Sequence, residues 1–229
     1  MNGFHNIEQK LEQFIKRYYL SALLKGMVLF FAIGLLYALL LLAIEHFFWL
    51  GTSGRLLLFW SVFCFEAILF YGLIFAPLAK YFKIQNRIDF ETASKIVGAH
   101  FPEVKDKLLN VLQLNQQSEH SEFLTASIEQ KSKNLSVISF KSAVNFSENI
   151  KYLPYAAIPI VILFLCIAFG KQAIFTDSLK RVVNYNTAYT PPAPFEFFVI
   201  NPSLEAIENT PFTLVAKTLG SVVPESVQI

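Results

Sequence analysis

Residues 27–78 decide the fold of this chain; they read MVLFFAIGLLYALLLLAIEHFFWL (27–50), GTSG (51–54) and RLLLFWSVFCFEAILFYGLIFAPL (55–78). A helix of roughly 20 apolar residues, rising about 1.5 Å per residue, crosses the hydrocarbon core of a bilayer. Both long blocks reach that length, and neither shows the polar face expected of a soluble amphipathic helix. The short link of small residues predicts an antiparallel hairpin of two transmembrane helices, over 26–50 and 55–78.

A third apolar block, residues 152–170, lies between Lys151 and Lys171 and predicts a third transmembrane helix. The composition agrees, since hydrophobic residues make up 54% of the chain and charged residues 16%, against roughly 25% charged in soluble domains. The net charge of +2 comes without a basic stripe interleaved with aromatic residues. Nucleic acid is therefore not an expected partner, whereas a lipid bilayer is.

The distribution of Lys and Arg predicts the orientation. Four basic residues precede the first span, ten lie in residues 79–151, one, Arg55, stands at the boundary of the hairpin link and four follow Gly170. The positive-inside rule then places the N-terminus and residues 79–151 in the cytoplasm, and the C-terminus outside, in the periplasm of a bacterial inner membrane.

Two cytoplasmic segments are expected to be helical. In residues 1–25 the apolar side chains recur at helical spacing, which predicts either an amphipathic helix on the inner membrane surface or a polar extension of the first span. Residues 79–151 form a helical insert: Asp89 caps a first helix, Pro102 starts a second, and a third follows the polar residues 115–119. Ten basic and eight acidic residues in this insert favour a protein-docking surface. The candidate docking residues are Phe101, Pro102, Leu108, Leu109 and Leu112.

The remaining chain is expected to lie outside the membrane. Residues 171–194, which end in the stiff segment Pro191–Pro194, form a linker. Residues 195–229 contain short strand patterns at 195–200, 204–207, 212–217 and 226–229. This spacing predicts the start of an immunoglobulin-like (Ig-like) β domain. Four strands cannot close such a sandwich, so we expect a longer chain or a partner to complete it.

The insert contains the phrase ASKIVGAHFPEVKDKLLN at residues 93–110. This phrase resembles a motif of an uncharacterised family of large bacterial membrane proteins, the domain-of-unknown-function family 4175. The resemblance implies a helical hairpin, a cytoplasmic insert, a third span and an extracytoplasmic β region, in the inner membrane of a Gram-negative cell. It supplies no catalytic residues. It also implies a link to a MoxR-type ATPase system with von Willebrand-type proteins, which favours a role in an assembly.

Glu66 lies near the middle of the second predicted span, where a charge costs roughly 2.5–3.5 kcal/mol. It is a candidate proton or ion relay, together with Tyr37, Glu45 and His46; alternatively it is protonated, or hydrogen-bonded as a packing residue. The helix rise places Glu45 about 8 Å, and Glu66 about 16 Å, from the outer ends of their helices, so direct contact is not expected and Tyr37 is a closer match in depth. The packing interpretation is favoured, because relays show several ionisable groups at related depths.

No pattern of residues predicts an enzyme. The chain has no phosphate-binding glycine loop, nucleophile elbow or paired-histidine zinc motif, and His100 and His120 stand apart from other ligand types. No catalytic residue, cofactor or metal is expected. Glu45 and His46, beside aromatic residues, are expected at the outer membrane interface. Cys64 and Cys166 are expected to be reduced.

The sequence therefore predicts an α-helical membrane protein with three transmembrane helices, a helical cytoplasmic insert and a partial Ig-like β domain. The favoured function is a non-enzymatic scaffold that links cytoplasmic and periplasmic partners in a multiprotein complex. The alternatives are a subunit of a transport or secretion machine that uses Glu66, and a sensor that relays an outside signal to the insert.

Overall fold

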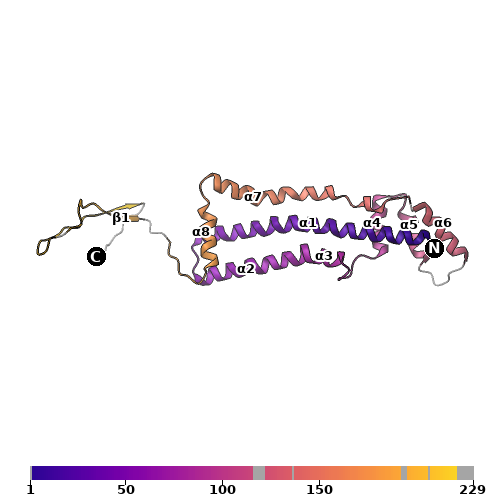
Figure 1. Cartoon of the computed structure of the whole chain (residues 1–229), viewed down its shortest axis with the longest axis horizontal. Helices are drawn as coiled ribbons and strands as arrows, with labels where there is room; N and C mark the ends of the chain where they lie inside the picture. The colour runs from indigo at the N-terminus through magenta and orange to yellow at the C-terminus, as the bar shows by residue number, and fades with distance from the viewer. Residues whose placement is uncertain (1, 116–121, 136, 192–194, 206, 221–229) are drawn as a thin grey trace. The chain divides into compact units, whose positions relative to one another are not determined.

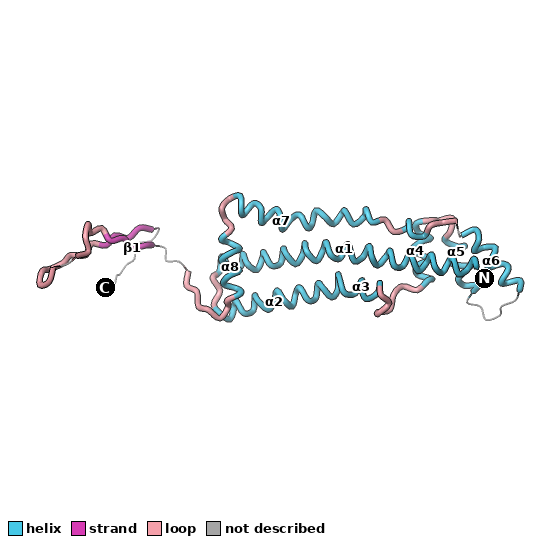
Figure 2. Tube along the Cα trace, in the orientation of Figure 1, coloured by secondary structure: helices cyan, strands magenta, loops and turns pink. Residues whose placement is uncertain are grey.

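The computed structural model describes residues 2–115, 122–135, 137–191, 195–205 and 207–220. The chain divides into two compact units, Met1–Asn186 and Thr187–Ile229. The first unit is helical, and the second contains a small antiparallel sheet (Figure 2). The helices of the first unit are α1 (Asn2–Phe48), α2 (Thr52–Phe70), the π-helix η1 (Tyr71–Phe75), α3 (Ala76–Tyr81), α4 (Phe90–His100), α5 (Lys105–Asn115), α6 (Glu122–Leu135), the 3-10 helices η2 (Phe140–Ala143) and η3 (Phe146–Tyr152), α7 (Leu153–Ala168) and α8 (Ala173–Val183).

Three helical stretches of this unit are long and apolar enough to cross a membrane: Gly3–Phe48, Thr52–Tyr81 and Phe140–Ala168. They cover most of each span predicted from the sequence, and the first and third end two residues before the predicted ends. In Figure 1, α1 runs beside both α2 and α7, and it contacts each of them. The link between α1 and α2 is three residues long, Trp49–Gly51, which confirms the predicted hairpin.

Helix α1 is continuous over 47 residues. Its first part carries the buried side chains Ile7, Leu11, Phe14 and Ile15, which pack into one hydrophobic core with residues of α4, α5 and α6. The prediction of a separate amphipathic helix lying on a membrane surface at residues 1–25 was therefore wrong. The alternative, an extension of the first span, is correct, because the apolar stripe of α1 is covered by the insert helices.

The insert folds largely as predicted. Asp89 caps α4 by accepting a hydrogen bond from the Thr92 backbone N–H at 2.9 Å. Helix α5 begins at Lys105, three residues after Pro102. The polar break predicted at 115–119 lies outside the described residues, apart from Asn115 at the end of α5.

Two of the proposed docking side chains belong to the core of the insert. Leu108 and Leu112 are buried in it, so their assignment to a docking surface was wrong, whereas Phe101 is partly buried and packs against this core. The apolar faces of the insert helices instead pack against α1 in one hydrophobic core. Pro102 is exposed and Leu109 is half-buried.

The second apolar hairpin helix changes its geometry at η1. Pro77 has no N–H, so it cannot donate the helical hydrogen bond to the carbonyl of Leu73, four residues earlier. The Leu73 carbonyl oxygen instead faces Gly26 of α1, where a Cβ atom would overlap it. Gly26 thus permits a close backbone approach between α1 and the π-helical turn.

Residues 171–194, predicted as a linker, contain helix α8 (Ala173–Val183), which lies across the ends of α1 and α2 (Figure 1). The side chains of Ser178, Arg181 and Val182 form its buried face. The linker prediction was wrong for this part, because a short helix gains its stability from packing rather than from a long sequence signal.

In the second unit, β1 (Phe195–Val199) pairs antiparallel with β2 (Ala216–Gly220), so that Phe195 lies opposite Gly220 and Val199 opposite Ala216. The predicted strand at 195–200 is confirmed. The predicted strand at 212–217 begins only at Ala216, and the described residues of 204–207 are not a strand. The strand predicted at 226–229 lies outside the described residues.

Two ion pairs of Glu12 fasten the segment before α4 to α1. Arg87 donates from Nη1 to Glu12 Oε1 at 2.9 Å, and Lys83 Nζ lies 2.8 Å from the same oxygen. The hydrogen bonds from Arg87, supported by Lys83 and opposed by partial burial, lower the pKa of Glu12 from 4.5 to about 2. The folded state therefore stabilises the ionised carboxylate of Glu12 relative to the unfolded chain.

We predict that Glu12 stabilises the insert at neutral pH and that this contribution is lost as the pH falls from about 4.5 towards about 2. Glu12→Gln is expected to lower the free energy of unfolding by about 1 kcal/mol at neutral pH, with a smaller difference below about pH 3. Thermal unfolding at several pH values measures this. Glu103→Gln, at an exposed acid before α5, is the control. Equal pH dependence of wild type and Glu12→Gln would contradict the assignment.

Candidate functional site

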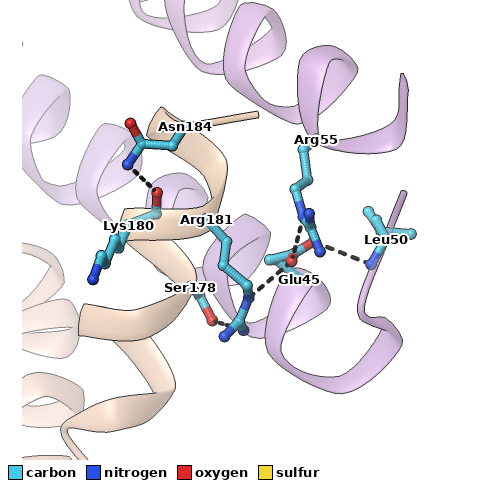
Figure 3. Close-up of polar contacts among 7 residues, drawn as sticks. All are labelled: Glu45, Leu50, Arg55, Ser178, Lys180, Arg181 and Asn184. Atoms are coloured by element: carbon cyan, nitrogen blue, oxygen red, sulfur yellow. Dashed lines mark hydrogen bonds and ion pairs between the residues drawn. The ribbon is translucent and has the colours of Figure 1, made fainter. Parts of the chain in front are cut away.

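The carboxylate of Glu45, three residues before the end of α1, is fully buried between two arginines (Figure 3). Its Oε1 accepts hydrogen bonds from Nε of Arg55 at 2.8 Å and from Nε of Arg181 at 3.0 Å. Its Oε2 accepts one from the backbone N–H of Leu50 at 3.2 Å. A buried carboxylate is tolerated because two guanidinium groups balance its charge and both of its oxygens accept hydrogen bonds.

Each residue of this ion cluster comes from a different helix. Glu45 belongs to α1, Arg55 to the first turn of α2, and Arg181 to the buried face of α8. Trp49, with a φ of 46°, turns the chain between α1 and α2. The cluster therefore joins α1 to both α2 and α8 through one carboxylate.

Arg181 is held by further contacts. Its Nη2 donates to the Ser178 hydroxyl at 3.1 Å, and its guanidinium lies 4.1 Å from the centroid of the Trp49 ring. These contacts direct Nε towards Glu45. In Figure 3, Arg55 and Arg181 approach the Glu45 carboxylate from opposite sides.

The sequence identified Glu45 as a candidate but not its two partners. Arg55 was noted only as a boundary residue, and Arg181 lay in the segment predicted as a linker. Within that segment, the helical spacing of Ser178, Arg181 and Val182 was the signal that could have located α8.

His46, the neighbouring candidate, is not part of the ion cluster. Its ring lies edge-on to Phe47, with centroids 5.3 Å apart, and its buried Nδ1 has no hydrogen-bond partner among the described residues. The chain thus pairs Glu45 with arginines rather than with the adjacent histidine.

Glu66 lies against a different part of α1. A Cβ atom at Gly34 would clash with both carboxylate oxygens of Glu66, so Gly34 makes room for this side chain beside α1. Eleven residues separate Gly34 from Glu45, about 16 Å along the helix. The prediction that Glu66 and Glu45 do not meet is confirmed.

Tyr37, the predicted depth match of Glu66, lies one turn further along α1 than Gly34. Its ring packs against Phe65, the residue before Glu66, with centroids 4.1 Å apart. No hydrogen bond joins Tyr37 and Glu66 in the described part of the chain. Tyr37 and Glu66 therefore lie at similar depths, as predicted. The contact that Tyr37 makes there, however, is with the ring of Phe65.

The described residues contain no group of three His, Cys, Asp or Glu side chains placed to hold a metal ion. Cys64 is exposed and Cys166 is half-buried, and both are free thiols. The polar chemistry of the apolar helices is therefore concentrated at the ion cluster and at Glu66.

These features define a helical protein with three helices of membrane-spanning length and composition, two of which, α1 and α2, are joined to α8 by buried charges. The chain matches no family model, no curated protein and no solved structure.

We predict that Glu45→Gln destabilises the first unit by about 3–5 kcal/mol, because it leaves two buried guanidinium groups without their counter-charge. The measurement is thermal unfolding of the detergent-purified chain, followed by Trp fluorescence. Asp177→Asn, which removes an exposed carboxylate from α8, is the matched control and is expected to change little. If both variants unfolded like wild type, the cluster would not be the element that joins the helices.

Proposed function

We propose that this protein is a non-enzymatic membrane anchor and scaffold, with the insert in the cytoplasm and the second unit in the periplasm. The observation that supports this proposal most directly is the continuity of α1. One helix of 47 residues, about 70 Å long, takes part in the core of the insert at one end and in the ion cluster at the other. Such a helix connects two binding surfaces rigidly.

Membrane insertion is supported by the exposed surface of the three apolar stretches. Within the most apolar 18-residue window of each, 22%, 0% and 6% of the residues are buried inside the chain. Large side chains such as Phe31, Leu57 and Phe164 are 68–72% exposed. Apolar surface of this extent requires lipid or a partner.

The direction of insertion rests on charge. The insert and the start of α1 together contain 14 Lys and Arg, whereas the residues after Gly170 contain four. We place the insert on the cytoplasmic side for this reason. The opposite end, which holds the Glu45 cluster, then lies at the periplasmic side.

The second unit is proposed as a docking platform. Phe197, Phe198 and Val199 of β1 are about half exposed, because a two-stranded sheet has no layer to cover its faces. Further strands, from additional chain or from a partner, would bury this surface and complete an Ig-like sandwich. On the cytoplasmic side, Pro102 and Leu109 remain accessible for a partner.

The resemblance of residues 93–110 to the domain-of-unknown-function family 4175 supports the same proposal. By this analogy the protein belongs in the inner membrane of a Gram-negative bacterium, in an assembly with a MoxR-type ATPase system. The partners are then other membrane or periplasmic proteins.

The scaffold proposal predicts that partners of both compartments purify with the tagged protein in mild detergent. A variant that ends at Asn186 keeps the first unit whole, because Thr187–Ile229 is a separate compact unit. It is expected to retain the cytoplasmic partners and to lose the periplasmic ones, as measured by quantitative mass spectrometry. This truncation is sharper than removal of the insert, which would uncover the core face of α1. Recovery of the intact protein without stoichiometric partners would refute the scaffold.

The alternative, a subunit of a transport or secretion machine, is favoured by one observation: a carboxylate at position 66 inside an apolar helix, with space for it provided by Gly34.

For a scaffold, we expect Glu66→Gln to leave partner recovery and cell phenotype unchanged. A proton relay would lose its dependence on a pH gradient, measured by transport or pH-sensitive dye assays in vesicles. Cys64→Ser, in the same helix, is the control. A pH-dependent flux that only Glu66→Gln abolishes would favour the transport function.

A further inference from the structure

A basic pocket lies at the end of the first unit opposite the ion cluster, between α1, the end of α3, and the segment η2–η3. Its volume is about 310 Å³. Three cationic side chains line the pocket: Lys16, Arg17 and Lys141. The rest of its polar and aromatic lining is Gln13, Tyr81 and Phe146, and no acidic residue lines it.

The strongest evidence for an anion site in this pocket comes from Arg17. Its guanidinium lies against the ring of Phe146, 4.7 Å from the centroid, which fixes the plane of the group. Its Nε is buried and has no hydrogen-bond partner among the described residues. A buried guanidinium N–H without an acceptor is costly, and an anion with several oxygens would satisfy it.

The acidic residue closest in sequence does not fill this role. Glu12 is engaged by Arg87 and Lys83 and does not line the pocket. None of the described ion pairs includes Lys16, Arg17 or Lys141. The pocket therefore presents concentrated positive charge without an internal counter-ion.

The position of the pocket suggests the source of the anion. Tyr81 directly follows Lys80, where the apolar stretch Thr52–Tyr81 ends. Leu20 lines the side of the pocket nearer the apolar part of α1. If the helices cross a bilayer as proposed above, the pocket lies at the level of the cytoplasmic headgroups, where basic pockets between helices bind anionic lipids.

We propose that Arg17, Lys16 and Lys141 form a binding site for a phosphate group, carried by the headgroup of an anionic phospholipid or by a soluble phosphate compound. The phosphate oxygens accept hydrogen bonds from Arg17 Nε and from the two ammonium groups, with Gln13 and Tyr81 as further donors. The lipid source rests on the proposed membrane insertion, whereas the phosphate chemistry does not.

The test uses the full chain in a neutral detergent, with binding measured by calorimetry for three probes. The probes are short-chain phosphatidylglycerol, short-chain diacylglycerol without phosphate, and inorganic phosphate. Arg17→Gln and Lys141→Gln are expected to weaken phosphatidylglycerol binding about tenfold or more. Lys107→Gln, at an exposed lysine of α5 outside the pocket, is the charge-matched control and is expected to bind normally. Arg17→Lys keeps the charge but lacks Nε, and it should bind less tightly than wild type.

The outcomes separate the possible sources. Phosphatidylglycerol binding that depends on Arg17 and Lys141 supports the site with a lipid ligand. Inorganic phosphate binding with the same dependence, and no gain from lipid, supports the site with a soluble ligand. An absence of binding to every probe, or an equal loss in all three glutamine variants, overturns the proposal. Since this measurement needs neither partners nor a membrane orientation, its failure is distinct from failure of the scaffold.

Discussion

The structure of the first unit depends on the continuity of α1. This helix contacts α2, α3, α4, α6, α7 and α8, so each of those elements is placed relative to the others through it. Its first part presents an apolar stripe to the insert, and its later part presents an almost wholly apolar surface. Because α1 is continuous, it belongs both to the core of the insert and to the hairpin within one compact unit.

Charge fixes the ends of this unit, while apolar surface forms its middle. At one end, Glu45 holds Arg55 and Arg181 in a buried cluster; near the other, Glu12 holds Arg87 and Lys83. The two arrangements differ in their energetics. The Glu12 pairs are partly exposed and contribute little each, whereas the Glu45 pairs are buried, so the loss of one partner is costly. Substitutions in the Glu45 cluster are therefore expected to cost more stability than substitutions in the Glu12 pairs.

Glycine and proline control the contacts between the apolar helices. Gly26 accommodates the Leu73 carbonyl, to which Pro77 cannot donate a hydrogen bond, and Gly34 accommodates the Glu66 side chain. In apolar surroundings, association between helices depends on such close approaches, because the hydrophobic effect no longer distinguishes one apolar surface from another. Contacts of this kind fix how α1 and the second hairpin helix meet.

The sequence by itself determined the three apolar helices, the hairpin, the cap at Asp89 and the first strand of the second unit. Each of these follows from a local rule: the length of an apolar run, a tight link, an N-cap or an alternating pattern. Only the tertiary structure decided that residues 7–15 join the insert core, that Leu108 and Leu112 are buried, and that Ala173–Val183 is a helix. The partners of Glu45 belong to this second group. Arg181 lies 136 residues from Glu45 in the chain, and a contact at that separation is set by packing, which no local pattern encodes.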